Sequence, residues 1–206
     1  MAEKYLDKIY GVSDAETQRA LYDQWAESYD SELDDARYAT PSRIARALKP
    51  LLKEAELAAP VLDFGCGTGL SGEALAAEGF TRIHGADVST GMLEMARAKG
   101  CYETLTPLPF GNPDPGLVSR YRTVTAAGAI SPGAAPASCL PAIFMALPSG
   151  GRLALSYNEK ALEDEEYMNM LTRITESSEA VLEVSEDGPH IEGLGSVSRV
   201  MVIRRR

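Results

Sequence analysis

The sequence predicts an α/β fold: an open, mostly parallel sheet with helices on both faces and an N-terminal helical cap. From Pro60 onward, short apolar runs alternate with helical patterns, which is typical of repeated strand–helix units. A glycine-rich turn joins the first of these runs to the helix that follows it. The last two runs are separated only by residues 186–195, which favours an antiparallel hairpin at one edge of the sheet.

Residues 1–58 are expected to form the cap. Its first helix follows a candidate capping box made by Ser13 and Glu16. The apolar residues that recur at helical spacing in this helix are Leu21, Tyr22, Trp25, Ala26 and Tyr29. A second helix is expected from Thr40 and bends near Pro50, because proline removes a backbone donor.

Residues 59–206 are expected to form the main domain. The predicted strands are 61–64, 82–87, 102–105, 122–127, 152–157, 180–184 and 197–204. Helices are predicted directly after the glycine turn and over 92–100, 140–147 and 162–174. The segment 107–116 contains four prolines and two glycines and is predicted to be a loop.

The composition excludes several classes of partner. Lys and Arg number 20 and Asp and Glu 30, and the resulting net charge of −10 disfavours nucleic acid and anionic membranes. No apolar run reaches the length of a membrane helix, and the first residues are too polar for a signal peptide, so a cytoplasmic protein is expected. The three cysteines, Cys66, Cys101 and Cys139, form no spaced pair, so neither a disulfide nor a metal site is expected.

A glycine-rich turn follows the first predicted strand, in the segment Val61-Leu62-Asp63-Phe64-Gly65-Cys66-Gly67-Thr68-Gly69-Leu70. In an open α/β sheet, ligands bind where the carboxyl ends of the strands meet, so this turn belongs to the ligand crevice. Its glycines let bare backbone approach a ligand closely. Asp87 ends the next strand, 20 positions after Gly67, a separation at which a carboxylate can bind a ribose diol.

Two classes of cofactor compete for this loop. Gly67, Gly69 and Gly72 match the dinucleotide fingerprint, so an NAD(P)-dependent oxidoreductase is one alternative. Asp63 favours the other class, because a carboxylate at the end of the first strand repels a pyrophosphate. S-adenosylmethionine has no phosphate and carries a sulfonium and an ammonium, which such a carboxylate attracts. We therefore expect S-adenosylmethionine, with the nicotinamide cofactor kept as the alternative.

The pattern Asp63-x-Gly65-x-Gly67-x-Gly69 followed by Asp87 resembles the class I S-adenosylmethionine-dependent methyltransferases. The resemblance extends over about residues 60–204. It implies a Rossmann-like, doubly wound sheet of seven strands with an antiparallel last strand, and methyl transfer to an unidentified small-molecule acceptor. Three further segments resemble the Williams-Beuren syndrome region methyltransferase-like group: Tyr22-Asp23-Gln24-Trp25-Ala26-Glu27-Ser28-Tyr29-Asp30, Ala127-Gly128-Ala129-Ile130-Ser131-Pro132-Gly133 and Leu194-Gly195-Ser196-Val197.

The resemblance also implies the cofactor contacts. The residues concerned are Tyr29, Asp63, Gly65, Cys66, Gly67, Gly69, Asp87, Val88, Met92 and Ala127. The side chain of Asp63 and the glycine-loop backbone are expected to hold the methionine end of the cofactor, and Asp87 the ribose hydroxyls. Val88 and Met92 are expected to pack against adenine, Ala127 to pass close to the sulfonium, and Tyr29 to cover the pocket from the cap.

Two positions depart from the family pattern. The family usually carries an Asp shortly before Leu-Pro-Phe, which bonds the adenine amine, but before Leu108-Pro109-Phe110 the only nearby acid is Glu103. Arg122 precedes the fourth strand, where the family often has Asp. We therefore expect adenine recognition to use backbone groups.

The chemistry expected at this site requires little from protein side chains. The cofactor already activates the methyl group, so the protein mainly supplies orientation and exclusion of water. A base helps when the acceptor has a high pKa, and His190, in the loop between the last two strands, is the candidate. His84 falls inside a strand and is expected to be structural. A protein that binds S-adenosylmethionine without catalysis, as a sensor or scaffold, is a third alternative.

Overall fold

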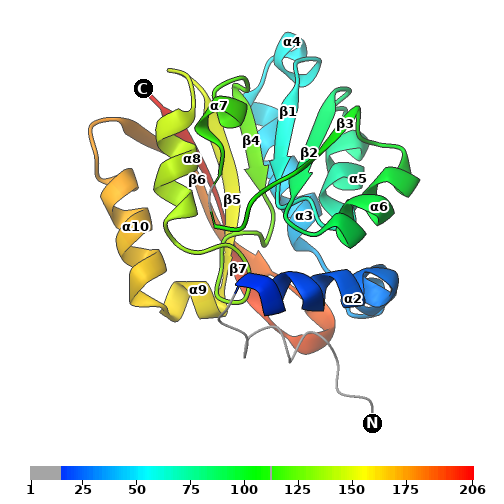
Figure 1. Cartoon of the computed structure of the whole chain (residues 1–206). Helices are drawn as coiled ribbons and strands as arrows, with labels where there is room; N and C mark the ends of the chain where they lie inside the picture. Colours follow the sequence, from blue (N-terminus) through cyan, green and yellow to red (C-terminus); the bar gives the residue numbers. More distant parts are fainter. Residues whose placement is uncertain (1–14, 112) are drawn as a thin grey trace.

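A computed structural model describes residues 15–111 and 113–206, and it confirms the predicted α/β fold. One seven-stranded sheet runs in the order β3-β2-β1-β4-β5-β7-β6 (Figure 1). All neighbouring strands pair in parallel except those that involve β7, which is antiparallel to both β5 and β6. The strands are β1 (Val61–Phe64), β2 (Ile83–Asp87), β3 (Thr104–Pro107), β4 (Thr123–Ala126), β5 (Arg152–Asn158), β6 (Ala180–Pro189) and β7 (Val197–Arg205).

Helices cover both faces of this sheet (Figure 1). The helices are α2 (Ala15–Asp35), α3 (Thr40–Leu48), α4 (Glu54–Leu57), α5 (Leu70–Ala77), α6 (Thr90–Lys99), α7 (Pro115–Val118), α8 (Cys139–Ala146), α9 (Glu159–Glu163) and α10 (Glu165–Thr175), with 3-10 turns η1 (Lys49–Leu51) and η2 (Glu192–Leu194). Helices α7, α8 and α10 pack on one face, and α3 and α5 pack on the other. Helix α2 lies across the edge where the parallel strands end (Figure 1).

Strand side chains alternate between two hydrophobic cores. Along β5, Leu153, Leu155 and Tyr157 belong to the core under α8 and α10, whereas Ala154 belongs to the core under α3 and α5. Strand β7 divides in the same way, with Ile203 in the first core and Val202 in the second. Burial on both faces explains why the central strands lack a regular alternation of apolar and charged residues.

Local backbone signals account for the differences from the predicted elements. The helix predicted over 162–174 is two helices, because the backbone is extended at Asp164 and its carboxylate caps α10 by accepting from the Glu166 amide at 2.8 Å. Strand β3 lies two residues later than predicted, and β6 continues to Pro189 past a bulge near Leu182. The bend expected at Pro50 is the 3-10 turn η1. Ser13 of the predicted capping box lies outside the described residues.

The two cap helices contact different parts of the molecule. Ile44, Ala45 and Leu48 of α3 are buried against β1, β5 and β7, so α3 forms part of the helical layer on the sheet. Helix α2 instead contacts α6. The domain boundary between residues 58 and 59 stays a prediction. Within the described part of the chain, no helix is both long and apolar enough to span a membrane.

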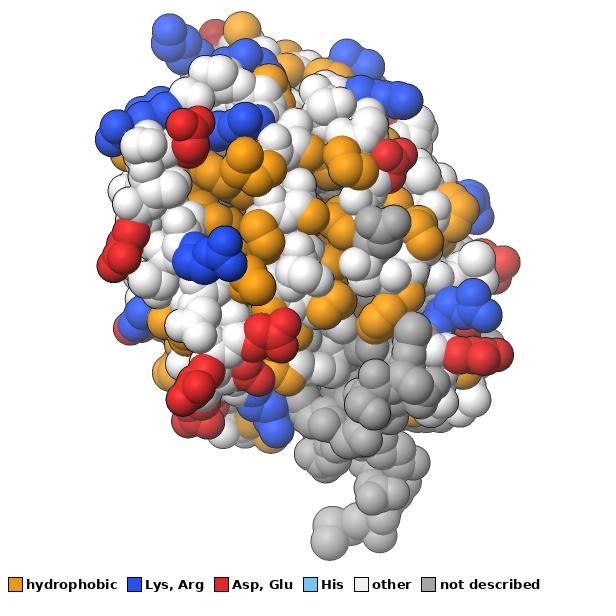
Figure 2. All heavy atoms as spheres, turned by 60° about the vertical axis from the view of Figure 1, so that its left-hand side comes forward, with side chains coloured by type: hydrophobic (Ala, Val, Ile, Leu, Met, Phe, Trp, Pro, Cys, Tyr) orange, Lys and Arg blue, Asp and Glu red, His pale blue; other side chains and the backbone are white. Residues whose placement is uncertain are grey.

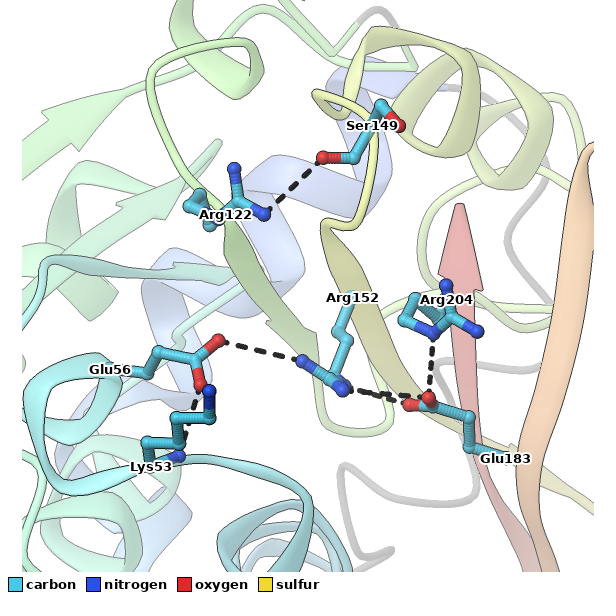
Figure 3. Close-up of polar contacts among 7 residues, drawn as sticks. All are labelled: Lys53, Glu56, Arg122, Ser149, Arg152, Glu183 and Arg204. Carbon is cyan, nitrogen blue, oxygen red and sulfur yellow. Dashed lines mark hydrogen bonds and ion pairs between the residues drawn. The ribbon is translucent and has the colours of Figure 1, made fainter. Parts of the chain in front are cut away.

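Charged side chains lie on the surface and also cluster at the end of the sheet opposite the glycine turn, where the parallel strands begin. Figure 2 shows hydrophobic side chains over the middle of one face and acidic and basic side chains toward its margins. At the opposite edge, Glu183 accepts from Arg152 and from Arg204, each at 2.7 Å, and Arg152 also lies 3.6 Å from Glu56 (Figure 3). Arg122 lies at this same edge and donates to the Ser149 carbonyl (Figure 3). These contacts join β5, β6 and β7 at their ends.

We predict that Glu183→Gln lowers stability in a pH-dependent way. Burial alone would raise the pKa of Glu183, but hydrogen bonds from Arg152 and Arg204 outweigh it and lower the pKa. A lowered carboxyl pKa in the folded state adds stability above the ordinary value of 4.5, and this stability is lost as the pH falls through the folded pKa. Denaturation at pH 7 should show a loss of about 1–2 kcal/mol, and the loss should shrink toward pH 3.

The matched control is Asp187→Asn, because Asp187 pairs with Arg199 on the same hairpin but is largely exposed to solvent. Exposed pairs add little stability, so this variant should stay close to the parent. A pH-independent loss in Glu183→Gln would contradict the electrostatic explanation.

Candidate functional site

A cavity lies at the carboxyl ends of β1, β2 and β4, where the sequence predicted a ligand crevice. It encloses about 690 Å³ of empty space, its open mouth included. Of the ten predicted cofactor residues, it brings together seven: Tyr29, Gly65, Gly67, Asp87, Val88, Met92 and Ala127. The cavity therefore gathers the glycine turn, the end of β2, the end of β4 and the cap helix around one space.

The glycine turn is shaped for backbone approach and is tied to Asp87. Gly67 has a φ of +52°, and no atom lies within 4 Å of where its Cβ would be. Its amide donates to Asp87 Oδ2 at 2.9 Å, and the Ser89 amide donates to Oδ1, also at 2.9 Å. Burial raises the pKa of Asp87, and these amides lower it in part. A Cβ on Gly65 would lie 2.4 Å from the Ala129 Cβ, so the turn packs tightly against the loop after β4.

Asp63 does not line this cavity, and the expected contact of its side chain with the methionine end stays a prediction. Its carboxylate is fully buried and accepts from Ser71 at 2.6 Å, Tyr102 at 2.8 Å and Thr125 at 2.9 Å. Burial raises the pKa of Asp63, and the three hydroxyl donors lower it in part. These donors come from α5, from the segment before β3 and from β4, so Asp63 holds the base of the turn together.

Cys66 and Gly69 also lie outside the main cavity lining. Cys66 is a buried residue of the turn, and burial together with the charges of Asp63 and Asp87 raises the pKa of its thiol. Gly69 is the N-cap of α5 in the left-handed conformation, and a Cβ there would lie 3.0 Å from Lys99 and Tyr102 atoms. The sequence pattern identified the turn correctly, but it did not separate the residues that face the cavity from those that support it.

The far end of the cavity is apolar. The side chains that join Val88 and Met92 there come from the loop after β3, and this part of the lining is Leu108, Pro109, Phe110 and Gly111. Glu103 points away: it is exposed and bonds to Arg82 and His84. His84 also bonds to Tyr121 at 2.8 Å, which accounts for both of its ring nitrogens. Among the described lining residues, the segment Leu108 to Gly111 contributes no acid to this end of the cavity.

Two acids of the cap helix, which sequence reasoning missed as site residues, hold α2 over the cavity. Asp23 accepts from the Gly91 amide at 3.0 Å and from the Ser89 hydroxyl at 2.5 Å, so it reaches the N-terminus of α6. Seven residues later, Asp30 accepts from Thr68 of the glycine turn and pairs with Lys99 at 2.8 Å. The two acids are spaced by two helical turns, so they lie on one face of α2. This spacing is the sequence signal that could have identified them as site residues.

Tyr22 and Tyr29 of α2 line the main cavity from above. Tyr22 donates to the Gly133 carbonyl at 3.1 Å, and the Tyr29 ring lies edge-on to Trp25, with 4.5 Å between the ring centroids. The aromatic stripe predicted on this helix therefore faces the site as well as the domain.

A second cavity, with about 480 Å³ of empty space that includes its open mouth, adjoins the first, and His190 lines it. Tyr22, Tyr29 and Gly128 line both cavities. His190 follows β6 at the same sheet edge as Gly65 and Asp87, as predicted, but it does not line the cavity that holds the other predicted residues. The residue is 7% exposed, and burial lowers the pKa of its imidazole to about 4, with the nearby Arg43 charge acting in the same direction. His190 is therefore neutral at pH 7.

A chain of hydrogen bonds holds His190 from behind. Its Nδ1 lies 2.8 Å from the Thr40 hydroxyl, which lies 3.1 Å from the Ser198 hydroxyl. Arg43 donates to the same Ser198 oxygen at 2.8 Å. Among the described residues, no cluster of three or more His, Cys, Asp or Glu side chains is arranged to hold a metal ion.

Comparison with known proteins identifies the family. Residues 61–111 match the model of a methyltransferase domain. The human protein "Methyltransferase-like protein 27" is 34% identical over 142 residues, which cover 68% of this chain and 58% of that protein. The chain belongs to the class I S-adenosylmethionine-dependent methyltransferases.

Solved structures of methyltransferases share this fold. Magnesium protoporphyrin IX methyltransferase from Synechocystis, with bound S-adenosylmethionine, matches with a TM-score of 0.57 and 17% identity, covering 98% of this chain and 90% of that one. A TehB-like methyltransferase from Corynebacterium glutamicum matches with a TM-score of 0.55 and 17% identity, covering 88% and 98%. The matched part of the chain spans less than two thirds of the human relative's length.

S-adenosylmethionine is the methyl donor of this family, and the cavity fits it. The open space above Gly67 allows a ligand to approach the bare backbone, and Asp87 presents a carboxylate where a ribose diol can bind. The apolar end between Val88, Met92 and Leu108 suits a purine ring. The residues present therefore match the three chemical parts of the donor.

We predict that Asp23→Ala weakens the binding of S-adenosylhomocysteine by about five- to tenfold. The variant removes the acceptor at the N-terminus of α6 and frees one end of α2, which covers the cavity. Calorimetric titration measures the affinity. Asp34→Ala, an exposed acid on the same helix, is the control and should bind as the parent does. Equal affinity in the Asp23 variant would show that α2 does not act through this contact.

Proposed function

We propose that this protein transfers the methyl group of S-adenosylmethionine to a small-molecule acceptor. The observation that carries the proposal is the pairing of the glycine turn with Asp87 at a cavity that the cap helix covers. When bound, the donor supplies a methyl group on a sulfonium. A lone pair of the acceptor forms the new bond to the methyl carbon, the sulfur keeps the electrons of the broken carbon–sulfur bond as a neutral thioether, and a proton carried by the acceptor atom passes to water.

The protein's own residues then bind the donor, orient it and shield it from water. Asp87 accepts hydrogen bonds from the ribose hydroxyls. The loop backbone at Gly65 and Gly67 contacts the methionine end, and the small side chain of Ala127 leaves room for the reacting atoms. Asp63 acts indirectly, because its bonds to Ser71, Tyr102 and Thr125 keep the turn in place. Tyr22 and Tyr29 cover the cavity and exclude water, which raises the rate of an in-line displacement that depends on orientation.

The second cavity favours a small acceptor. It is covered by α2 and shares lining residues with the donor cavity, so a molecule in it lies beside the donor. The net charge of −10 opposes binding of nucleic acid. Both observations support a small molecule over a polymeric acceptor.

The first test is ligand-induced stabilisation. Because a ligand that binds only the folded state raises the melting temperature, S-adenosylhomocysteine should raise it and NAD should not. Asp87→Asn should weaken the binding of S-adenosylhomocysteine by about 30-fold or more, since the charge-assisted hydrogen bonds from both ribose hydroxyls are lost. Asp35→Asn, at the exposed end of α2, is the control.

The outcomes separate the three alternatives. Stabilisation by NAD alone would overturn the proposal in favour of an oxidoreductase. Stabilisation by S-adenosylhomocysteine, without transfer from labelled donor to any compound of a broad small-molecule library, would favour a sensor or scaffold.

A further inference from the structure

We propose that the second cavity binds an uncharged, planar aromatic acceptor, and that His190 holds this acceptor by donating its Nε2–H. The proposal rests on the proposed function, because it assigns the acceptor of the same site. It differs from the base that the sequence predicted at His190, since it makes this residue a donor.

The described walls of the second cavity carry no formal charge. Tyr22, Trp25, Tyr29 and Tyr38 supply aromatic surface, and His190 is neutral. The other described lining residues are Leu33, Gly128, Ser131, Pro132, Gly133, Asn158 and Ile191. An ionic acceptor would lose hydration there without gaining an opposite charge, whereas a neutral ring would pack against the aromatic side chains.

The hydrogen-bond chain behind His190 decides which ring nitrogen carries the proton. Arg43 is always a donor, so the Ser198 oxygen accepts from it, and the Ser198 proton points to Thr40. The Thr40 proton is then directed to His190 Nδ1. In this order each hydroxyl donates once and no proton is left over. The opposite order would leave the Ser198 proton without an acceptor among the described residues.

The proton of neutral His190 is therefore on Nε2. Among the described residues, no hydrogen-bond partner contacts Nε2, and the side chain lines the cavity. A nitrogen that already carries a proton cannot remove one from the acceptor. It can instead donate to an oxygen or a ring nitrogen of a neutral heteroaromatic molecule.

The edge-on contact with Tyr38, at 5.3 Å between ring centroids and an interplanar angle of 88°, fixes the plane of the imidazole. Thr40 fixes its rotation from the other side. Tyr38 lies in the segment that joins α2 to α3, and Thr40 is the first residue of α3, so the donor direction is set together with the helices of the cap.

Trp25 provides a site-specific readout, because it is the one tryptophan of the chain and lines the second cavity. The ¹⁵N-labelled protein, saturated with S-adenosylhomocysteine, is titrated with quinoline, N-methylquinolinium and 2-naphthoate, which are neutral, cationic and anionic bicyclic probes. Quinoline should shift the Trp25 indole signal in a saturable way, and the two charged probes should bind at least about tenfold more weakly. Charged probes that bind as tightly as quinoline, or no response to quinoline, would overturn the proposal.

The donor role is tested by His190→Phe, which keeps a ring but removes the N–H. Quinoline affinity should fall about five- to tenfold, while S-adenosylhomocysteine affinity stays that of the parent. His84→Gln, at the chain's other histidine, is the matched control and should change neither affinity, because within the described ranges the His84 ring bonds to Tyr121 and Glu103 and lines neither cavity. Unchanged quinoline affinity in His190→Phe would refute the donor role.

A measurement on the unmodified protein covers the case in which His190→Phe does not fold. The ¹⁵N shifts of the imidazole ring report which nitrogen carries the proton, and at pH 7 they should identify the Nε2–H form of His190. A proton on Nδ1 would overturn the assignment. Absence of S-adenosylhomocysteine binding in the parent would instead refute the proposed function itself.

Discussion

The buried carboxylate of Asp63 is the constraint around which the donor cavity is assembled. A fully buried carboxylate is costly unless hydrogen bonds satisfy it, and here Ser71, Tyr102 and Thr125 do so. Each donor comes from a different segment, so the need to satisfy one carboxylate fixes α5, β4 and the approach to β3 relative to β1. The glycine turn starts from this fixed base, and Asp87 can therefore bond the Gly67 amide.

A second set of acids joins the cap to this base. Asp23 and Asp30 of α2 accept bonds from the start of α6 and from the glycine turn, where backbone and hydroxyl donors are available. Helix α2 is thus held by the same loops that form the donor cavity. Placement of the cap and shape of the cavity are consequently coupled, and a ligand that orders the glycine turn also stabilises the cap.

Charge is distributed unevenly between the surface and the second cavity. The chain carries a net charge of −10, yet the described walls of the second cavity carry no formal charge, and four of their twelve residues are Tyr or Trp. The hydrogen-bond chain from Arg43 through Ser198 and Thr40 ends at His190 and leaves the cationic group outside this lining. The cavity thereby gains a directed donor without gaining a charge, which is the physical basis for a neutral acceptor.

The sequence by itself determined the sheet and the glycine turn, because hydrophobic periodicity predicts the strands. It also predicted that Gly65, Asp87 and Ala127 meet, because the carboxyl ends of parallel strands lie at the same end of the sheet. Only the tertiary structure decided which side chains face the cavity. Asp63 and Asp87 both stand at strand ends, but Asp63 is buried by donors from segments distant in sequence, whereas Asp87 borders open space. The protonation state of His190 likewise depends on Thr40, which is 150 positions away in the sequence, and on Ser198 of β7. No local sequence pattern indicates such contacts.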